Sequence, residues 1–332
     1  MRHVTVLGAS GYLGSAVTRL LLMSRCRVRL VSRRAPHGIV DEFEHREDVE
    51  VCQLDLRRPD AVEHAVRDSD HVICLVADLK SDRSWRRDDS PAAESVDFGV
   101  LERVIEHSRA AFKNRSVLFA STAALSRPGD DAARTPYELC KRRGERALFD
   151  ATNEGAVRGA SLRLASLVGV PQGASEPGMG AVRAFAERAL SGRPIELWTS
   201  GNVRRNLVHV DDAAAAVLAA LQHMERVAAN TWDVGAQVGT PLAEIAGLVT
   251  DAAARVTGQP PAPVVQVTPP PTATAHDLTD GTLEVGRFQA ATNWSPIRSI
   301  AEAIDETVTA LAHTSHPAMD HSFTVPAGKD IG

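Results

Sequence analysis

A glycine-rich turn near the start of the chain restricts the fold more than any other feature. Residues 3–7 form an apolar, β-branched run, and Gly8-Ala9-Ser10-Gly11-Tyr12-Leu13-Gly14 follows it directly. Apolar residues then recur at helical spacing, so the turn joins a predicted strand to a predicted helix. Glycines here let the chain turn tightly and let backbone N–H groups approach a pyrophosphate at the positive end of the helix dipole. The turn therefore predicts a dinucleotide-binding βαβ unit in preference to a plain strand-to-helix connection.

The first half of the chain continues this alternation of short apolar runs and longer amphipathic stretches. The predicted strands are 3–7, 27–31, 49–54, 71–76, 116–120 and 160–164, and the predicted helices are about 12–23, 59–68, 93–112 and 137–152. Strands that alternate with helices are typical of repeated βαβ units. We therefore predict an α/β fold, with a Rossmann-type doubly wound sheet of six or seven parallel strands between two helical layers.

The alternation ends near residue 170. A Gly/Pro loop, a helix to about residue 190, a strand-like run, a helix after Asp212, a Pro-rich segment and a last helix over 301–312 follow. We predict a Rossmann domain over 1–170, a smaller C-terminal substrate-binding lobe over 171–312 and a disordered tail over 313–332. The chain is expected to cross back to the first domain around 200–235.

Composition excludes several classes of protein. The 332 residues carry 37 Lys and Arg against 42 Asp and Glu, without a basic block, so we expect neither nucleic acid nor an anionic membrane as a partner. A hydrophobic content of 44% excludes a disordered chain. The apolar run at the N-terminus is too short for a signal peptide, and 213–221 is about half the ~20 residues that cross a bilayer. We expect a cytoplasmic protein.

Four cysteines, Cys26, Cys52, Cys74 and Cys140, lack CxxC or histidine-paired spacing. Metal and disulfide interpretations are therefore both weak, and we expect buried free thiols and no metal.

The end of the second predicted strand indicates which dinucleotide binds. NAD-specific proteins place an acidic residue there for the ribose hydroxyls, whereas this chain has Ser32-Arg33-Arg34. Guanidinium groups pair bidentately with a 2′-phosphate, so we predict NADP(H); the alternative is a solvated basic turn. Asp55, after the third strand, either accepts a hydrogen bond from the adenine amino group or initiates a turn before Pro59.

A second constellation of polar residues follows the fifth predicted strand. That strand ends in Ser121-Thr122, and Tyr137 and Lys141 stand on one face of the next helix at i, i+4 spacing. An adjacent ammonium and a nicotinamide cation would lower the pKa of a phenol and make it a usable proton donor. Such a string also occurs by chance on surface helices, so its significance depends on the strand end and the glycine turn.

The chain resembles the extended short-chain dehydrogenase/reductase family, also called the NAD-dependent epimerase/dehydratase family, over about residues 3–312. The resemblance rests on the motifs above and on three further features, which are Glu145 after Lys141, Leu162-Arg163-Leu164-Ala165-Ser166-Leu167-Val168-Gly169, and Arg204-Arg205-Asn206-Leu207-Val208-His209-Val210-Asp211-Asp212.

The resemblance implies roles for individual residues. Thr122 would polarise the substrate oxygen, Tyr137 would transfer the proton, and Lys141 would hold the nicotinamide ribose and tune Tyr137. The implied substrates are nucleotide-diphosphate sugars, with Arg205 on the diphosphate; the alternative for Arg205 is a surface charge near Asp211 and Asp212. The predicted cofactor contacts are Gly8, Ser10, Gly11, Tyr12, Leu13, Ser32, Arg33, Arg34, Asp55, Leu56, Leu75, Ala77, Lys141 and Leu167, and the predicted substrate contacts are Ser121, Ser166 and Arg205.

Departures from the family pattern narrow the expected reaction. Ala123-Ala124 replaces the Asp-Glu pair of the dehydratases, so dehydration should be lost. Ser166 stands where many relatives have Asn, and Cys74-Leu75-Val76-Ala77 replaces a frequent His-x-Ala-Ala, so substrate and cofactor contacts at these positions should differ from those of the relatives.

The chain is most similar to the 4-ketoreductases of antibiotic deoxysugar pathways. We expect NADPH-dependent reduction of the keto group, at C4, of a dTDP-type keto-deoxysugar. The alternatives are an NDP-sugar 4-epimerase and a non-catalytic NADP-sensing regulator. We also expect a homodimer through the helices at 93–112 and 137–152.

Overall fold

A computed structural model describes most of the chain. The described residues are 2–34, 46–77, 94, 96–127, 129, 131, 134–174, 177–271, 273, 275–281 and 283–315.

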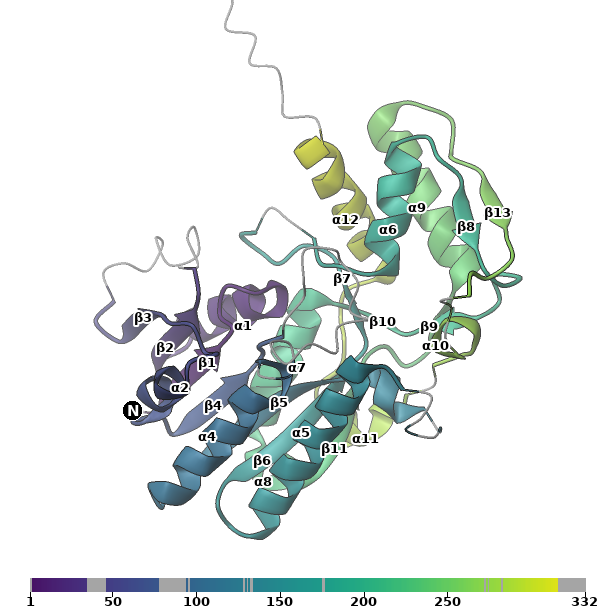
Figure 1. The fold of residues 1–332 in the computed structure, drawn as a ribbon. Coiled ribbons are helices and arrows are strands. Elements are labelled where there is room, and N and C mark those ends of the chain that lie inside the picture. The colour runs from purple at the N-terminus through teal and green to yellow at the C-terminus, as the bar shows by residue number, and fades with distance from the viewer. Residues whose placement is uncertain are drawn as a thin grey trace, which may run out of the picture.

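A parallel sheet of seven strands forms the centre of the molecule (Figure 1). Its order is β11-β6-β5-β4-β1-β2-β3, and the predicted α/β fold is confirmed. The strands are β1 (His3–Leu7), β2 (Arg27–Ser32), β3 (Val49–Gln53), β4 (His71–Cys74), β5 (Ser116–Thr122), β6 (Arg158–Leu164) and β11 (Asn230–Val234). All residues of β1 and β4 are buried, as expected for strands covered on both faces. The seventh strand, β11, was not predicted individually.

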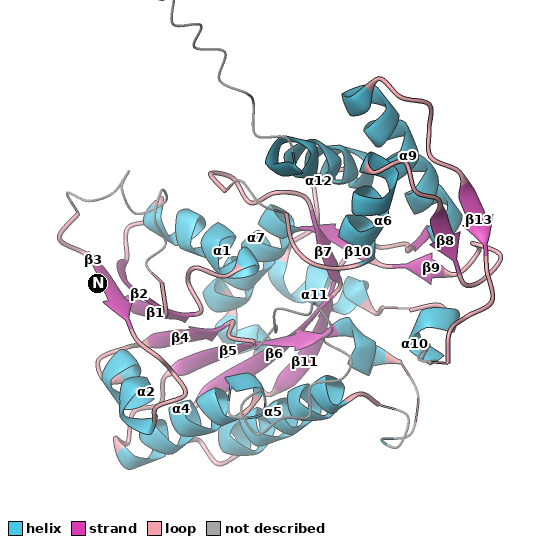
Figure 2. Cartoon of the chain, turned by 45° about the horizontal axis from the view of Figure 1, so that its top comes forward, coloured by secondary structure: helices cyan, strands magenta, loops and turns pink. Residues whose placement is uncertain are grey.

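Helices cover both faces of the sheet (Figure 2). On one face, α2 (Pro59–Val66), α4 (Gly99–Ala110) and α5 (Pro136–Asn153) enclose an aliphatic core that includes Val104, Phe119 and Leu148. The helices that close the other face are α1 (Tyr12–Leu22), α7 (Val210–Gln222), the short α8 (Met224–Val227) and α11 (Val285–Thr292). Helix α7 packs on α1, and β11 pairs with β6 at the edge of the sheet. The predicted division of the chain into domains, with a crossing back around 200–235, stays a prediction.

The rest of the chain builds a C-terminal lobe beside the carboxyl edge of the sheet (Figure 1). Its core lies among α6 (Ala181–Leu190), α9 (Leu242–Thr257) and α12 (Ile300–Ser315). The lobe also contains α10 (Ala275–Leu278) and three pairs of short strands. The pairs are β7 (Ser166–Val168) with β10 (Leu207–His209), β9 (Arg204–Arg205) with β12 (Thr240–Pro241), and β8 (Ile195–Leu197) with β13 (Val264–Gln266). One further short helix, η2 (Ala123–Ser126), directly follows β5 of the sheet. The predicted tail begins too early, since 313–315 belong to α12; residues 316–332 lie outside the described part.

All four cysteines are free, but only Cys74 is buried, and the other three are half-buried. Within the described residues, no helix is long and apolar enough to span a membrane, and no group of three or more His, Cys, Asp or Glu side chains could hold a metal ion.

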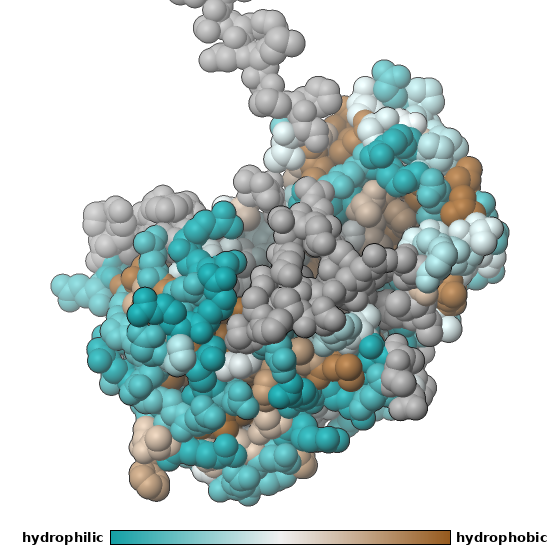
Figure 3. Space-filling model, in the orientation of Figure 1, coloured by the Kyte–Doolittle hydropathy of each residue, from teal (hydrophilic) through white to brown (hydrophobic). Residues whose placement is uncertain are grey.

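The surface over α4 and α5 is mainly hydrophilic (Figure 3). Two large apolar side chains are exposed on or beside these helices, Phe112 after α4 and Phe149 on α5. The predicted homodimer through these helices stays a prediction.

Candidate active site

The glycine turn forms a compact backbone loop between β1 and α1. Gly8 has a φ of +95°, and its N–H donates to the Val31 carbonyl at 2.8 Å. A Cβ on Gly14 would lie 1.9 Å from the Gly8 oxygen, so no side chain fits there. Gly11 caps α1 without a side-chain hydrogen bond, which leaves the first N–H groups of the helix available to an anion. The residues present fit the pyrophosphate of a nicotinamide dinucleotide.

Tyr12 connects this turn to the C-terminal lobe. Its hydroxyl donates to the Gly169 carbonyl at 2.7 Å, and burial raises the pKa of the phenol. The predicted cofactor contact of Tyr12 stays a prediction, as do those of its exposed neighbour Ser10 and the buried Leu13.

The end of β2 carries the predicted 2′-phosphate contacts. The side chain of Ser32 is buried and donates to the Arg34 carbonyl at 2.5 Å, while Arg33 and Arg34 are exposed. Across from them, Asp55 pairs with Arg57, and Oδ2 and Nη2 are 2.5 Å apart. The Arg57 guanidinium, helped by Arg33, lowers the pKa of Asp55 to about 2. The surface next to Ser32, at the end of β2, thus carries the guanidinium groups of Arg33, Arg34 and Arg57. Of the other predicted cofactor contacts, Leu56 is buried, and Leu75, Ala77 and Leu167 are half-buried.

The predicted catalytic residues come from β5 and from the first turns of α5. Thr122 ends β5, and its Oγ1 accepts the Ala124 N–H at 3.3 Å. Thr135 and Glu138 form a capping box that fixes the start of α5, so Tyr137 lies in the first turn. Lys141, one turn later, is 2% exposed, and its Nζ lies 5.5 Å from the centroid of the Tyr137 ring. The predicted proximity of Tyr137 and Lys141 is therefore seen in the structure.

Burial and the charge of Lys141 act in opposite directions on the pKa of Tyr137. The pKa of Tyr137 is raised above its ordinary value, because burial disfavours the phenolate more than the Lys141 ammonium favours it. The buried Asp97 acts in the same direction as burial. The predicted lowering effect of Lys141 is therefore confirmed in sign, but burial outweighs it. At neutral pH the hydroxyl of Tyr137 carries its proton.

A largely buried ion pair between Glu145 and Arg163 lies next to this site. Glu145, on α5, accepts hydrogen bonds from Arg163 on β6 at 2.8 and 2.7 Å. The Ser121 hydroxyl donates to the same carboxylate at 2.7 Å. This network joins β5, β6 and α5 through Ser121, which precedes Thr122, and Glu145, which lies one turn after Lys141. The predicted substrate contact of Ser121 stays a prediction, and the link to Glu145 could not be inferred without the strand pairing.

Arg205 and Ser166 lie on two of the short strands of the lobe, β9 and β7. Arg205 donates from Nη1 to the Thr279 carbonyl at 3.0 Å and from Nη2 to the Asp277 carbonyl at 2.6 Å. Burial lowers the pKa of the neighbouring Arg127 to about 10, and the charge of Arg205 adds to this effect. Ser166 is exposed at the start of β7. Their predicted contacts with a substrate stay predictions.

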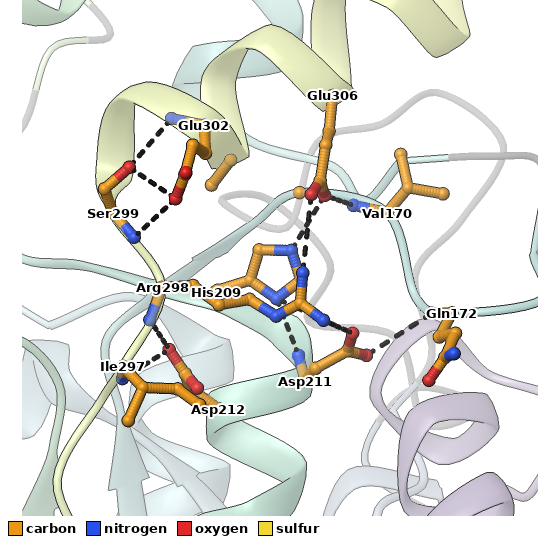
Figure 4. Close-up of polar contacts among 12 residues, drawn as sticks. Val170, Gln172, His209, Asp211, Asp212, Ile297, Arg298, Ser299, Glu302 and Glu306 are labelled. Atoms are coloured by element: carbon orange, nitrogen blue, oxygen red, sulfur yellow. Dashed lines mark hydrogen bonds and ion pairs between the residues drawn. The ribbon is translucent and has the colours of Figure 1, made fainter.

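A polar junction ties α12 of the lobe to α7 of the sheet domain (Figure 4). The fully buried His209 accepts the Asp211 N–H at Nδ1, 3.0 Å away, so its proton is on Nε2, which donates to Glu306 at 2.8 Å. Arg298 lies 3.2 Å from Asp211 and 3.5 Å from Glu306. This junction was not predicted from the sequence, although the segment over 204–212, which contains His209, is one of the motifs of the family resemblance.

The sequence profile of the NAD dependent epimerase/dehydratase family matches residues 4–235. The chain belongs to this family. A search of curated protein sequences gives no significant match.

Several solved structures share the fold. UDP-glucose 4-epimerase from Thermotoga maritima, solved with UDP-glucose, is 21% identical with a TM-score of 0.74, over 95% of this chain and 100% of that one. UDP-glucuronic acid 4-epimerase from Bacillus cereus, with UDP-glucuronic acid and NAD, is 16% identical with a TM-score of 0.74, over 93% and 99%. UDP-glucose 4-epimerase from Thermus thermophilus, with NAD, is 24% identical with a TM-score of 0.71, over 92% and 97%. These similarities establish the fold.

Proposed function

We propose that the protein reduces the keto carbon of a nucleotide-activated sugar with NADPH. The observation that carries this proposal is the placement of Tyr137 and Lys141 on α5, which packs against β5 and its terminal Thr122. In the sheet order, β4 alone separates β5 from β1 and its glycine turn. Two strand spacings are about 10 Å, so the turn and Thr122 lie near each other at the carboxyl edge of the sheet, where doubly wound folds bind their ligands.

The side chains would act on the substrate oxygen. NADPH, when bound, supplies the hydride that adds to the keto carbon. Tyr137 donates its proton to the oxygen as negative charge develops there, and its raised pKa keeps that proton in place at neutral pH. The Thr122 hydroxyl, which accepts the Ala124 N–H through its oxygen, keeps its own hydrogen for a bond to the same substrate oxygen. The Lys141 ammonium stabilises the tyrosinate left after transfer.

The preference for NADPH follows from the charges next to β2. Arg33 and Arg34 are exposed at the position where an NAD-binding relative would place a carboxylate, and Asp55 is already paired with Arg57. Solved relatives were crystallised with NAD, so this preference separates the present chain from them.

Substitution of both arginines tests the cofactor preference. In the wild type, NADPH should bind more tightly than NADH, because each charge-assisted contact with the 2′-phosphate contributes about 1.5 to 3 kcal/mol. Arg33→Ala/Arg34→Ala should lose this difference and keep its affinity for NADH, as measured by titration of both cofactors. Arg193→Ala, an exposed arginine on the lobe, is the control and should leave both affinities unchanged. Equal affinities in the wild type would contradict the assignment.

An NDP-sugar 4-epimerase is the second candidate, and the fold shared with UDP-sugar 4-epimerases favours it. The two reactions differ in their use of cofactor. A reductase consumes NADPH steadily with a 4-keto sugar nucleotide, whereas an epimerase interconverts UDP-glucose and UDP-galactose without net consumption. A non-catalytic sensor would bind NADPH and do neither. We expect steady NADPH oxidation with a dTDP-4-keto-6-deoxysugar; interconversion alone would establish the epimerase.

A further inference from the structure

The residues that follow β7, 169–173, are bonded to α1 on one side and to α12 on the other. We call them the connecting segment. Gly169 has a φ of +92°, and a Cβ there would lie 2.3 Å from Nε2 of His209, so no side chain fits. The Gly169 carbonyl accepts the Tyr12 hydroxyl at 2.7 Å, and the Gly169 N–H donates to Oγ1 of Thr307 at 3.1 Å. The connecting segment therefore joins the first turn of α1 to the lobe.

Glu306 holds the connecting segment from the side of α12 (Figure 4). Its Oε2 accepts the Nε2–H of the buried His209 at 2.8 Å and the Val170 N–H at 3.3 Å. Arg298 lies 3.5 Å from the other carboxylate oxygen, Oε1. The imidazole of His209 occupies the space beside Gly169. One carboxylate thus fixes both the backbone of the segment and the ring against which the segment packs.

Tyr12 carries this arrangement to the dinucleotide turn. It is the first residue of α1, directly after Gly11, so its own N–H is among those that the helix leaves without a partner. Its ring packs against Gly178, where a Cβ would lie 2.3 Å from Cε1 of the tyrosine. Burial raises the pKa of the phenol, and the charges of Asp211 and Glu306 raise it further, so the hydroxyl remains a donor. The side chain of Tyr12 is therefore anchored at the connecting segment, while its backbone belongs to the turn.

We propose that Glu306 is a positioning residue for the dinucleotide, acting through the connecting segment and Tyr12. The carboxylate itself has no need to touch the cofactor. It fixes Val170 and His209, and these two fix Gly169. The Gly169 carbonyl then fixes the side chain of Tyr12, the residue that begins α1. A first turn that is held before the ligand arrives loses less conformational freedom on binding, and affinity rises accordingly.

The inference rests on the dinucleotide binding of the proposed function, but it does not depend on which reaction follows. Titration calorimetry of the full-length protein with NADP⁺ tests it. Tyr12→Phe removes only the hydroxyl, and Glu306→Ala removes the carboxylate. Each should weaken NADP⁺ binding by about fivefold or more, within the usual range of coupling between distant sites.

Two further variants separate positioning from a general loss of structure. Because the two side chains act along one chain of contacts, Tyr12→Phe/Glu306→Ala should bind NADP⁺ about as weakly as the weaker single variant. Glu306→Gln keeps an oxygen that can accept from His209 and Val170, and it should restore most of the affinity. Tyr12→Phe keeps the ring, so its affinity decides the outcome even where Glu306→Ala does not fold.

Asp305 provides a matched control at the neighbouring position of α12. It lies 2.7 Å from Arg255 of α9, and half or more of each side chain is exposed, so Asp305→Ala should leave the affinity for NADP⁺ unchanged. Wild-type affinity in Tyr12→Phe, losses that multiply in the double variant, or an equal loss in Asp305→Ala would overturn the inference while the proposed function stands. A wild type that binds no nicotinamide dinucleotide would contradict the proposed function, and the inference with it.

Discussion

Replacement of Tyr137 by phenylalanine is expected to lower turnover by about 10² to 10⁴, the usual contribution of general acid catalysis. The variant keeps the ring that packs beside Lys141 but removes the hydroxyl whose proton would neutralise the developing alkoxide. Single-turnover oxidation of NADPH with a 4-keto sugar nucleotide measures this step.

The same preparations separate a chemical role from a structural one. Affinity for NADPH and the midpoint of urea unfolding should stay close to the wild type, because the ring and its packing remain. Leu139→Ala, on the same turn of α5, is a control that leaves the hydroxyl in place. A Tyr137→Phe protein with wild-type turnover would remove Tyr137 from the mechanism, and one that unfolds would make its role structural.

Substitution of Glu145 by alanine is expected to lower the free energy of unfolding by about 3–5 kcal/mol. The side chain of Glu145 is 6% exposed, and its loss leaves the guanidinium of Arg163 and the hydroxyl of Ser121 without their shared acceptor. Urea unfolding followed by circular dichroism measures the change.

An exposed ion pair near the end of the same helix is the matched control. Glu154 lies 2.6 Å from Arg109, with both side chains about half exposed. Because solvent screens such a pair, Glu154→Ala should cost less than about 1 kcal/mol. Equal effects of the two substitutions would show that the buried network around Glu145 contributes no special stability.

The helices and strands of the sheet domain could be predicted well, because the sequence patterns that mark their ends are local. β1 spans the predicted residues, and α1 and α2 end within two residues of their predicted ends, since apolar runs, the glycine turn and Pro59 mark these boundaries. β11 was harder to predict. Its sequence, Asn230-Thr231-Trp232-Asp233-Val234, contains two residues that strands disfavour, and it enters the sheet from a distant part of the chain.

The proximity of Tyr137 and Lys141 could be predicted from the sequence, whereas the net pKa shift of Tyr137 could not. The i, i+4 spacing of Tyr137 and Lys141 places them together on any helix, so their proximity required no tertiary information. The net pKa shift of Tyr137 depends on burial and on Asp97, which only the packed structure places beside it. The contact of His209 with Glu306 joins residues 97 positions apart, and no local pattern indicates it.

The position of β11 has a consequence for synthesis on the ribosome. The sheet is complete only when residue 234 has emerged, about 70 residues after the end of β6, its partner. At about 5–20 residues per second, β6 is an open edge for about 4 to 14 s, and α7 is not yet in place over the apolar side of α1. Unpaired edges of this kind attract other strands. The nascent chain therefore passes through an interval in which chaperone binding competes with aggregation, and a fragment that ends at the start of the lobe would remain in that state.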